Sequence, residues 1–216
     1  MSGLFITRLT QDPYNFFLWI FLVIFSICFH EYCHAQVALW EGDTTARDNG
    51  HLTLNPLKQM GPFSLLMLVF IGIAWGQVPV NPQRMRRKIS PLLVSLAGPF
   101  SNLLLYVVFT VLLYLTVILF KGTDHVTEAQ NAVRLFMLGA VLNFVLFAFN
   151  MLPAPPLDGF ELFKYFSHSD LDRNPELVKG VMIGIIFLAI FFIEYVFAAG
   201  VWLTMQWGVW FGITGS

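Results

Sequence analysis

The most constraining feature of the sequence is a run of thirty residues, from Pro91 to Phe120, that contains no charged side chain. A soluble helix carries charged residues on its exposed face, whereas a bilayer-spanning helix needs about 20 predominantly apolar residues. The rest of the chain has a similar character, because 57% of all residues are apolar and only 12% are charged. A typical soluble domain has about 25% charged residues. The sequence therefore predicts an all-α polytopic membrane protein.

Charge and cysteine content exclude other classes of protein. A net charge of −1 argues against nucleic acid as a partner. Two cysteines cannot form the disulfide framework of a small secreted domain.

Further apolar runs account for most of the remaining chain. Three of them are long enough for one crossing each: Tyr14–Leu39, Ala132–Leu152 and Val181–Trp202. The aromatic tail to Phe211 extends the last run or adds a short fifth helix. The first run is expected to stay in the protein, because the chain start lacks the basic region and cleavage site of a signal peptide. About 4–6 transmembrane helices in a single membrane-embedded domain over residues 1–216 are expected.

One apolar run is too short to be an ordinary crossing. Phe63–Trp75 has only 13 residues and has glycine and proline residues on both sides. Such a length is more typical of a re-entrant or short element. We therefore expect a re-entrant or short extended segment after the first transmembrane helix.

The first apolar run contains a motif that can bind a metal ion. Residues 30–34 have the pattern H-E-x-x-H. On a helix, His30 and His34 lie on the same face, so both imidazoles can reach one ion, and Glu31 beside them can act as a general base. Each ionisable side chain at membrane depth costs about 2.5–3.5 kcal/mol on insertion scales, which favours a functional role. The alternative is a buried polar patch that neighbouring helices satisfy.

A tetrahedral zinc ion that keeps one position open for water needs a third protein ligand. Asp158 is the leading candidate, because it follows three prolines in the segment Asn150–Gly159. Proline interrupts a helix, and irregular backbone at membrane depth is tolerated only inside protein or beside a water-filled cavity. The alternative is that the prolines end a transmembrane helix and Asp158 caps the next helix.

Together the two motifs resemble the site-2 protease family of intramembrane zinc metalloproteases. In that family H-E-x-x-H in an apolar helix is followed by N-x-x-P-x-P-x-L-D-G, the pattern of residues 150–159 here. Three shorter segments also resemble the bacterial members: Gly50–Pro56, Pro79–Pro82 and Ala97–Asn102. The resemblance covers about residues 20–165, and no inserted sensory domain of the kind that some members carry is expected.

The resemblance implies a metal centre with one zinc ion per chain. His30, His34 and Asp158 would bind the ion, and Glu31 would activate the water that attacks the scissile peptide. Asn150 would lie near the metal, where its amide polarises a carbonyl group or holds the substrate backbone.

The resemblance also implies a substrate, namely a transmembrane protein cut within or next to its membrane segment in regulated intramembrane proteolysis. Candidate contacts with this substrate are Asn102, Gly50 and His51. The segment Gly50–Asn55 is expected to be extended and to pair with the unwound substrate as an added strand.

The expected location is the lipid bilayer of a bacterial cell, in the inner membrane. The segment Arg84–Lys88 carries four positive charges, which places it in the cytoplasm by the positive-inside rule. His30 and Asp158 each lie toward the exit end of a helix that leads to that side, so the active site is expected to face the cytoplasm. The oligomeric state stays open.

Two other functions fit parts of the pattern. Intramembrane histidines and carboxylates also mark ion pathways, so a membrane metal transporter is one alternative. A catalytically inactive homologue that acts as a binding partner is the other, although the intact Glu31 argues against it.

Overall fold

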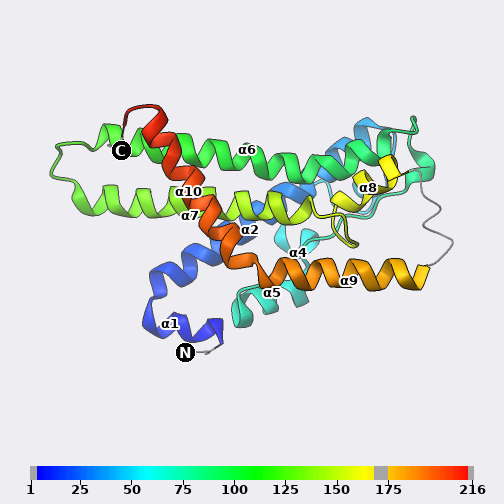
Figure 1. Ribbon diagram of the computed structural model, residues 1–216, viewed down its shortest axis with the longest axis horizontal. Coiled ribbons are helices and arrows are strands. Elements are labelled where there is room, and N and C mark those ends of the chain that lie inside the picture. Colours follow the sequence, from blue (N-terminus) through cyan, green and yellow to red (C-terminus); the bar gives the residue numbers. More distant parts are fainter. Residues whose placement is uncertain (1–3, 168–174, 214–216) are drawn as a thin grey trace. The chain divides into compact units, whose positions relative to one another are not determined.

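The structure is a computed structural model that describes residues 4–167 and 175–213. All regular secondary structure in these residues is helical (Figure 1). The chain divides into two compact units, Met1–Ser101 and Asn102–Ser216, and the boundary falls inside one long helix. The expected single domain over the whole chain stays a prediction. The helices are η1 (Phe5–Thr7), α1 (Arg8–Gln11), α2 (Pro13–Trp40), α3 (Thr45–Asp48), α4 (Pro56–Gln59), α5 (Gly61–Ile71), η2 (Pro82–Arg84), α6 (Ser90–Leu119), α7 (Val126–Asn150), α8 (Gly159–Ser167), α9 (Pro175–Phe191) and α10 (Ile193–Trp210).

Three helices of the described residues, α2, α6 and α7, are long and apolar enough to cross a membrane. This confirms the predicted class, an all-α polytopic membrane protein. The run Val181–Trp202, expected to be one crossing, is divided between α9 and α10, which meet at Phe192. Figure 1 shows the change of direction between these two helices. Apolar composition alone could not locate this break, because apolar residues continue on both sides of Phe192.

In the first unit, α2 begins at a well-formed cap, and a hydrogen bond joins it to the end of the short helix α5. The Asp12 carboxylate accepts a hydrogen bond from the Asn15 N–H, and Pro13 occupies the first helical position. The Trp19 indole N–H donates to the Gly72 carbonyl, 3.0 Å away, which joins α2 to the end of α5. With 11 residues, α5 is about 16 Å long, roughly half the thickness of a bilayer core. This length suits the expected re-entrant element.

The residues 73–81 after α5 are non-helical and are held by side chains and backbone of α4 and α5. The Ser64 hydroxyl bonds both the N–H and the carbonyl of Trp75. The Gln77 N–H donates to the Gln59 carbonyl, 2.9 Å away. Residues 73–78 alternate between exposed and half-buried, as in an extended chain.

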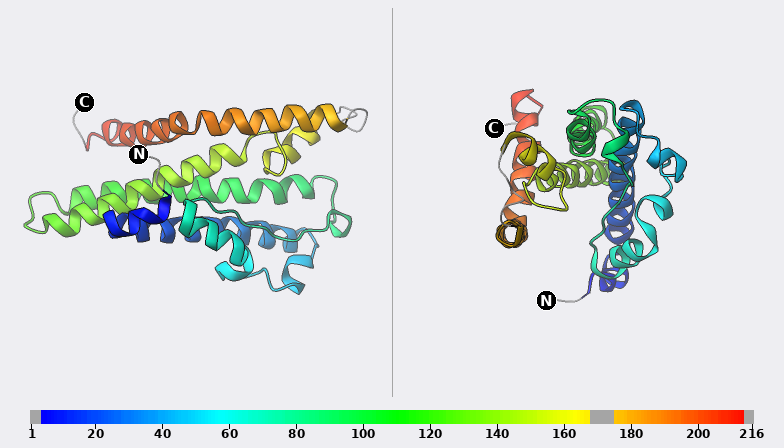
Figure 2. Two further views of the ribbon diagram at one scale, coloured as in Figure 1. Left: turned by 90° about the horizontal axis from the view of Figure 1, so that it is seen from below. Right: turned by 90° about the vertical axis from the view of Figure 1, so that its right-hand side faces the viewer.

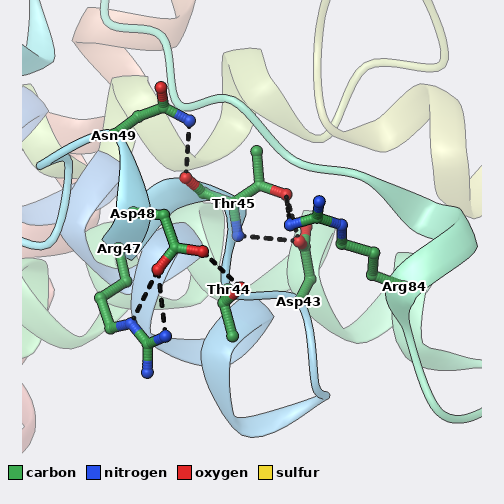
Figure 3. A network of polar contacts seen from close by, with 7 residues as sticks. All are labelled: Asp43, Thr44, Thr45, Arg47, Asp48, Asn49 and Arg84. Carbon is green, nitrogen blue, oxygen red and sulfur yellow. Dashed lines mark hydrogen bonds and ion pairs between the residues drawn. The ribbon is translucent and has the colours of Figure 1, made fainter.

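The C-terminal end of α2 is tied to the chain before α6 by two buried carboxylates. Glu41 accepts hydrogen bonds from the Arg87 guanidinium and the Ser90 hydroxyl. Asp43 accepts from both the N–H and hydroxyl of Thr45 (Figure 3). It also accepts from the backbone N–H of Asn81. Burial raises the pKa of the Asp43 carboxyl, but these hydrogen bonds together lower it more, so that its pKa lies below the ordinary value.

The Glu41 carboxylate is expected to make stability pH-dependent. Hydrogen bonds from Arg87 and then Ser90 lower its pKa from the ordinary value of 4.5. A lowered pKa stabilises the fold above the ordinary pKa, and this stabilisation is lost as pH falls through the folded-state pKa. Glu41→Gln is therefore expected to lower the thermal unfolding midpoint in detergent at neutral pH and to flatten its fall below about pH 4.5. Matching pH profiles for Glu41→Gln and wild type would contradict this role.

In the second unit, α6 and α7 lie side by side and run in opposite directions (Figures 1 and 2). Their contact is polar at one end, where Asn102 and Asn143 share a hydrogen bond, and aromatic farther along, where the rings of Phe109 and Phe136 lie 6.4 Å apart. Helix α10 packs across this pair, and its Thr204 carbonyl accepts from a buried tyrosine hydroxyl of α6. The unit is therefore built around α7.

The chain between α7 and α8 is irregular, as its prolines predict. Residues 151–158 form a series of tight turns, in which the Ala154 N–H donates to Leu152 and the Leu157 N–H donates to Ala154. Helix α8 begins at Gly159, where an added Cβ would lie 2.6 Å from the Leu152 carbonyl oxygen. Only glycine fits this close approach of backbone to backbone. Asp158 is the residue immediately before α8.

Candidate metal centre

The candidate metal centre in the first unit lies in the second half of α2. His30 and His34 are one helical turn apart, and their side chains are 7% and 8% exposed. The two Nε2 atoms are 2.9 Å from each other. The i, i+4 spacing therefore brings both imidazoles together, as expected from the motif.

The hydrogen bond of the other ring nitrogen sets the tautomer of His34. Its Nδ1 lies 2.7 Å from the backbone carbonyl of Val94 on α6. A carbonyl can only accept, so Nδ1 carries the proton and donates it. The neutral ring then keeps its lone pair on Nε2, the atom that faces His30. A carbonyl that orients a histidine in this way is typical of metal sites.

Glu31 follows His30 in the chain and lies about 100° farther round the helix. Its side chain is 8% exposed, so the carboxylate is also held inside the first unit. A buried carboxylate next to two imidazoles has the composition of a metal-dependent acid–base site.

The donor set of α2 fits zinc. Zinc accepts imidazole nitrogen at about 2.0–2.1 Å, and two nitrogens 2.9 Å apart can both be at that distance from one ion. Structural zinc sites are closed by four protein ligands, whereas a catalytic site has three and keeps one position open. In the first unit, His30 and His34 offer two nitrogens of the kind that such a site uses.

Asn150 and Asp158 lie in the second unit, at the end of α7 and just before α8. Both are half-buried. The Asn150 amide donates to the Leu146 carbonyl, 3.0 Å away. Asp158 occupies the position that a helix-capping residue would also take, so its sequence position fits both interpretations. The roles of these two residues at the metal stay predictions.

Asn102 makes a contact between helices. Its side chain is completely buried, and its amide N–H donates to the Asn143 side-chain oxygen, 2.9 Å away. The Asn143 amide donates in turn to the Gly139 carbonyl. Sequence reasoning missed Asn143, although an amide inside an apolar helix is itself a signal of such a contact. The expectation that Asn102 contacts the substrate stays a prediction.

Gly50 and His51 lie in a turn after α3. Gly50 has a positive φ of 76°, which favours glycine, and its N–H donates to Arg47. The carbonyls of His51 and Thr53 both accept from the Gln59 amide, at 2.8 and 2.6 Å. The chain bends at Leu52 and Thr53, and the bend is held by Gln59, a buried residue that sequence reasoning missed. The expected extended conformation of Gly50–Asn55 is wrong, because these bonds fold the segment onto α4.

The amino-acid sequence of this chain is similar to a known peptidase family and to individual bacterial proteins. The family model described as "Peptidase family M50" matches residues 18–193. YwhC of Bacillus subtilis is 37% identical over 66% of this chain, and the match covers 66% of its own length, just under two thirds. Rip2 of Mycolicibacterium smegmatis is 30% identical over 87% of this chain and 80% of its own length. Both relatives have the words zinc metalloprotease in their names. No solved structure matches.

Proposed function

Because the chain belongs to peptidase family M50, we propose that it is a zinc metalloendopeptidase that cleaves membrane proteins within or beside their transmembrane segments. The membership confirms the family predicted from the two motifs, a family of metallopeptidases with zinc as their metal. The observation that carries the proposal is the buried histidine pair of α2, since this helix is long and apolar enough to cross a membrane. Cleavage at that depth corresponds to regulated intramembrane proteolysis.

We assign one zinc ion per chain to His30, His34 and Asp158. The histidines supply two neutral nitrogens, one of them oriented by a backbone carbonyl, and Asp158 supplies a carboxylate oxygen. When bound, zinc acts as a Lewis acid that acidifies water and polarises a carbonyl group. Three protein ligands leave one position of a tetrahedral site open for chemistry.

Proton transfer is assigned to Glu31 and carbonyl binding to Asn150. Glu31 takes a proton from the attacking water and passes it to the amine that leaves. Burial of its carboxylate limits competition from bulk water. The Asn150 amide group has two N–H donors, so the bond to Leu146 leaves one for a substrate carbonyl.

The substrate must unwind before it is cut, because an α-helix keeps its peptide bonds in i→i−4 hydrogen bonds. The unwound segment then needs backbone partners. Gly50, His51 and Asn102 remain proposed contacts. The extended segment 73–81 is a further candidate for strand addition, because α4 and α5 already hold one side of it through Trp75 and Gln77.

Removal of the metal is expected to stop cleavage. Purified protein in detergent is incubated with a single-span membrane substrate, with and without 1,10-phenanthroline, and the products are located by mass spectrometry. We expect no product after chelation, recovery when zinc is added back, and a cut within or next to the membrane segment. Cleavage by zinc-free protein would contradict the proposal. Zinc uptake into proteoliposomes without any cleavage would favour the metal transporter.

We propose that the chain lies in the bacterial inner membrane with its metal centre toward the cytoplasm. The basic segment Arg84–Lys88 supports this orientation, because Arg87 binds Glu41 at the end of α2 that is nearer the histidine pair. It also requires α5 to be re-entrant, with both ends on the cytoplasmic side.

Labelling of introduced cysteines tests the orientation. Lys58→Cys and Gln77→Cys lie on the two sides of α5, and the two native cysteines of α2 are first replaced by serine. A membrane-impermeant maleimide added to intact cells is expected to modify neither position, and to modify both after the membrane is opened. Labelling of either one from the periplasm would overturn the proposed orientation.

A further inference from the structure

Two glycines of the first unit leave space beside the side chains of the metal centre, and neither is required by its own backbone. Glycines with positive φ occur elsewhere in the described residues, but Gly98 and Gly76 are not among them. Gly98 even lies inside α6, where glycine is less favourable than alanine. We propose that Gly98 and Gly76 are positioning residues of the zinc centre. Because Gly98 has no side chain, there is room for the metal beside the two imidazoles. Because Gly76 has no side chain, there is room for the catalytic carboxylate of Glu31.

The space at Gly98 lies against both imidazoles. A Cβ added there would be 2.5 Å from the His30 Cε1 atom and within 3.0 Å of the Nε2 atoms of His30 and His34. Any ion held by both nitrogens must be about 2 Å from each. A methyl group that touches the same two atoms therefore competes with the metal for one space.

The imidazoles cannot simply turn aside for such a methyl group. The His34 ring is held by its Nδ1–H bond to Val94, which lies one helical turn before Gly98 on α6. Both rings are also buried, so each has neighbours that resist rotation. Movement of His34 breaks a hydrogen bond, and movement of His30 separates the two nitrogens that bind the ion. Either response lowers the affinity for zinc.

Gly76 has the same relation to Glu31. A Cβ at Gly76 would be 2.6 Å from the Glu31 Cδ atom and within 3.0 Å of its Cγ and Oε1 atoms. Because Cγ itself is so close, rotation of the carboxylate alone cannot relieve the overlap. The whole side chain must adopt another rotamer, which moves the carboxylate out of its present position. Zinc binding does not depend on this carboxylate, so the effects at Gly76 and Gly98 are separable.

Zinc binding separates the role of Gly98 from a general effect of glycine replacement. Gly98→Ala is expected to bind zinc about 10–100-fold more weakly than wild type, measured by competition with a chromogenic chelator in detergent. Gly184→Ala is the matched control, since this helical glycine has open space where a Cβ would be, and it is expected to bind zinc normally. Wild-type affinity in folded Gly98→Ala would overturn the role of Gly98.

A comparison of unfolding midpoints tests the steric overlap between a Cβ at position 98 and the two imidazoles. It needs neither zinc nor substrate, so its result does not depend on whether the proposed function is correct. Thermal unfolding is measured for Gly98→Ala alone and in a protein that carries His30→Ala and His34→Ala. We expect a lower unfolding midpoint in the first case and no decrease in the second, because the rings are gone. Gly98→Ala could instead lower the unfolding midpoint equally in both proteins, or could prevent folding of the protein that lacks both histidines. Either result would show that Gly98 is needed for other packing and would overturn the proposal.

Gly76→Ala is expected to keep wild-type zinc affinity and to cleave the single-span substrate about 100-fold more slowly, as a misplaced catalytic group does. Its unfolding midpoint is compared with that of the same change combined with Glu31→Ala. We expect Gly76→Ala to destabilise only the protein that retains Glu31. Normal cleavage, or equal destabilisation in both proteins, would overturn the role of Gly76.

Discussion

Glu31→Gln is expected to slow cleavage severely while leaving zinc bound. Glutamine has nearly the same shape as glutamate but cannot take a proton from water, so only acid–base catalysis is removed. General acid–base catalysis contributes about 10²–10⁴-fold to rate, and we expect a loss in this range. Because Glu31 is not one of the proposed ligands, zinc content should stay near one ion per chain. The measurements are zinc analysis of the purified protein and product formation from the single-span substrate.

The control for Glu31→Gln is Glu128→Gln, the same chemical change at an exposed position in the first turn of α7. It is expected to keep both zinc and activity. Undiminished cleavage by Glu31→Gln would rule out Glu31 as the general base. Loss of zinc from Glu31→Gln would instead make this residue a ligand, and the assignment of Asp158 would then need revision.

Asp158→Ala is expected to lose zinc as well as activity. Changes to residues that only support a metal ligand weaken metal affinity by about 10–100-fold, so removal of a ligand itself should cost at least the upper figure. The matched control is Glu161→Ala, which removes another carboxylate in the first turn of α8 and breaks only an exposed pair with Lys164. Zinc affinity is measured by chelator competition in detergent.

The same variant decides between the two interpretations of Asp158. If the residue only caps α8, zinc affinity should match wild type, and the protein should lose about 0.5–2 kcal/mol of stability, the usual value of a helix cap. If it binds zinc, its absence should also remove the increase in unfolding midpoint that added zinc produces in wild type. Wild-type zinc binding by Asp158→Ala would therefore overturn the proposed ligand set.

Local sequence patterns predicted the parts of this protein that depend on residues close together in the chain. The run from Pro91 to Phe120 corresponds to α6, with ends that differ by one residue. The four-residue spacing of His30 and His34 brought their nitrogens together, because an α-helix repeats every 3.6 residues. The proline-rich segment after Asn150 is irregular, as the missing N–H donors require.

Long-range contacts were not visible in such patterns. The expected extended segment Gly50–Asn55 is bent at Leu52 and Thr53, where the Gln59 side chain binds the carbonyls of His51 and Thr53, and nothing in the local alternation of residues signals that bond. The partner of Asn102 is likewise forty-one positions away, on a different helix. A polar residue in an apolar helix indicates that a hydrogen-bond partner is needed, but only the packing of the helices determines which residue that partner is.

The sequence alone was sufficient for the membrane class, the metal motif and the family, since each depends on composition or on spacing within a few residues. The tertiary structure decided which backbone carbonyl orients His34 and which glycines leave room beside the metal-site side chains. Val94, Gly98 and Gly76 have no side chain that binds metal, and the family segment Ala97–Asn102 contains Gly98 without indicating what its missing side chain does. Their importance arises because the fold brings their backbone against α2, and such close approach is a property of packing.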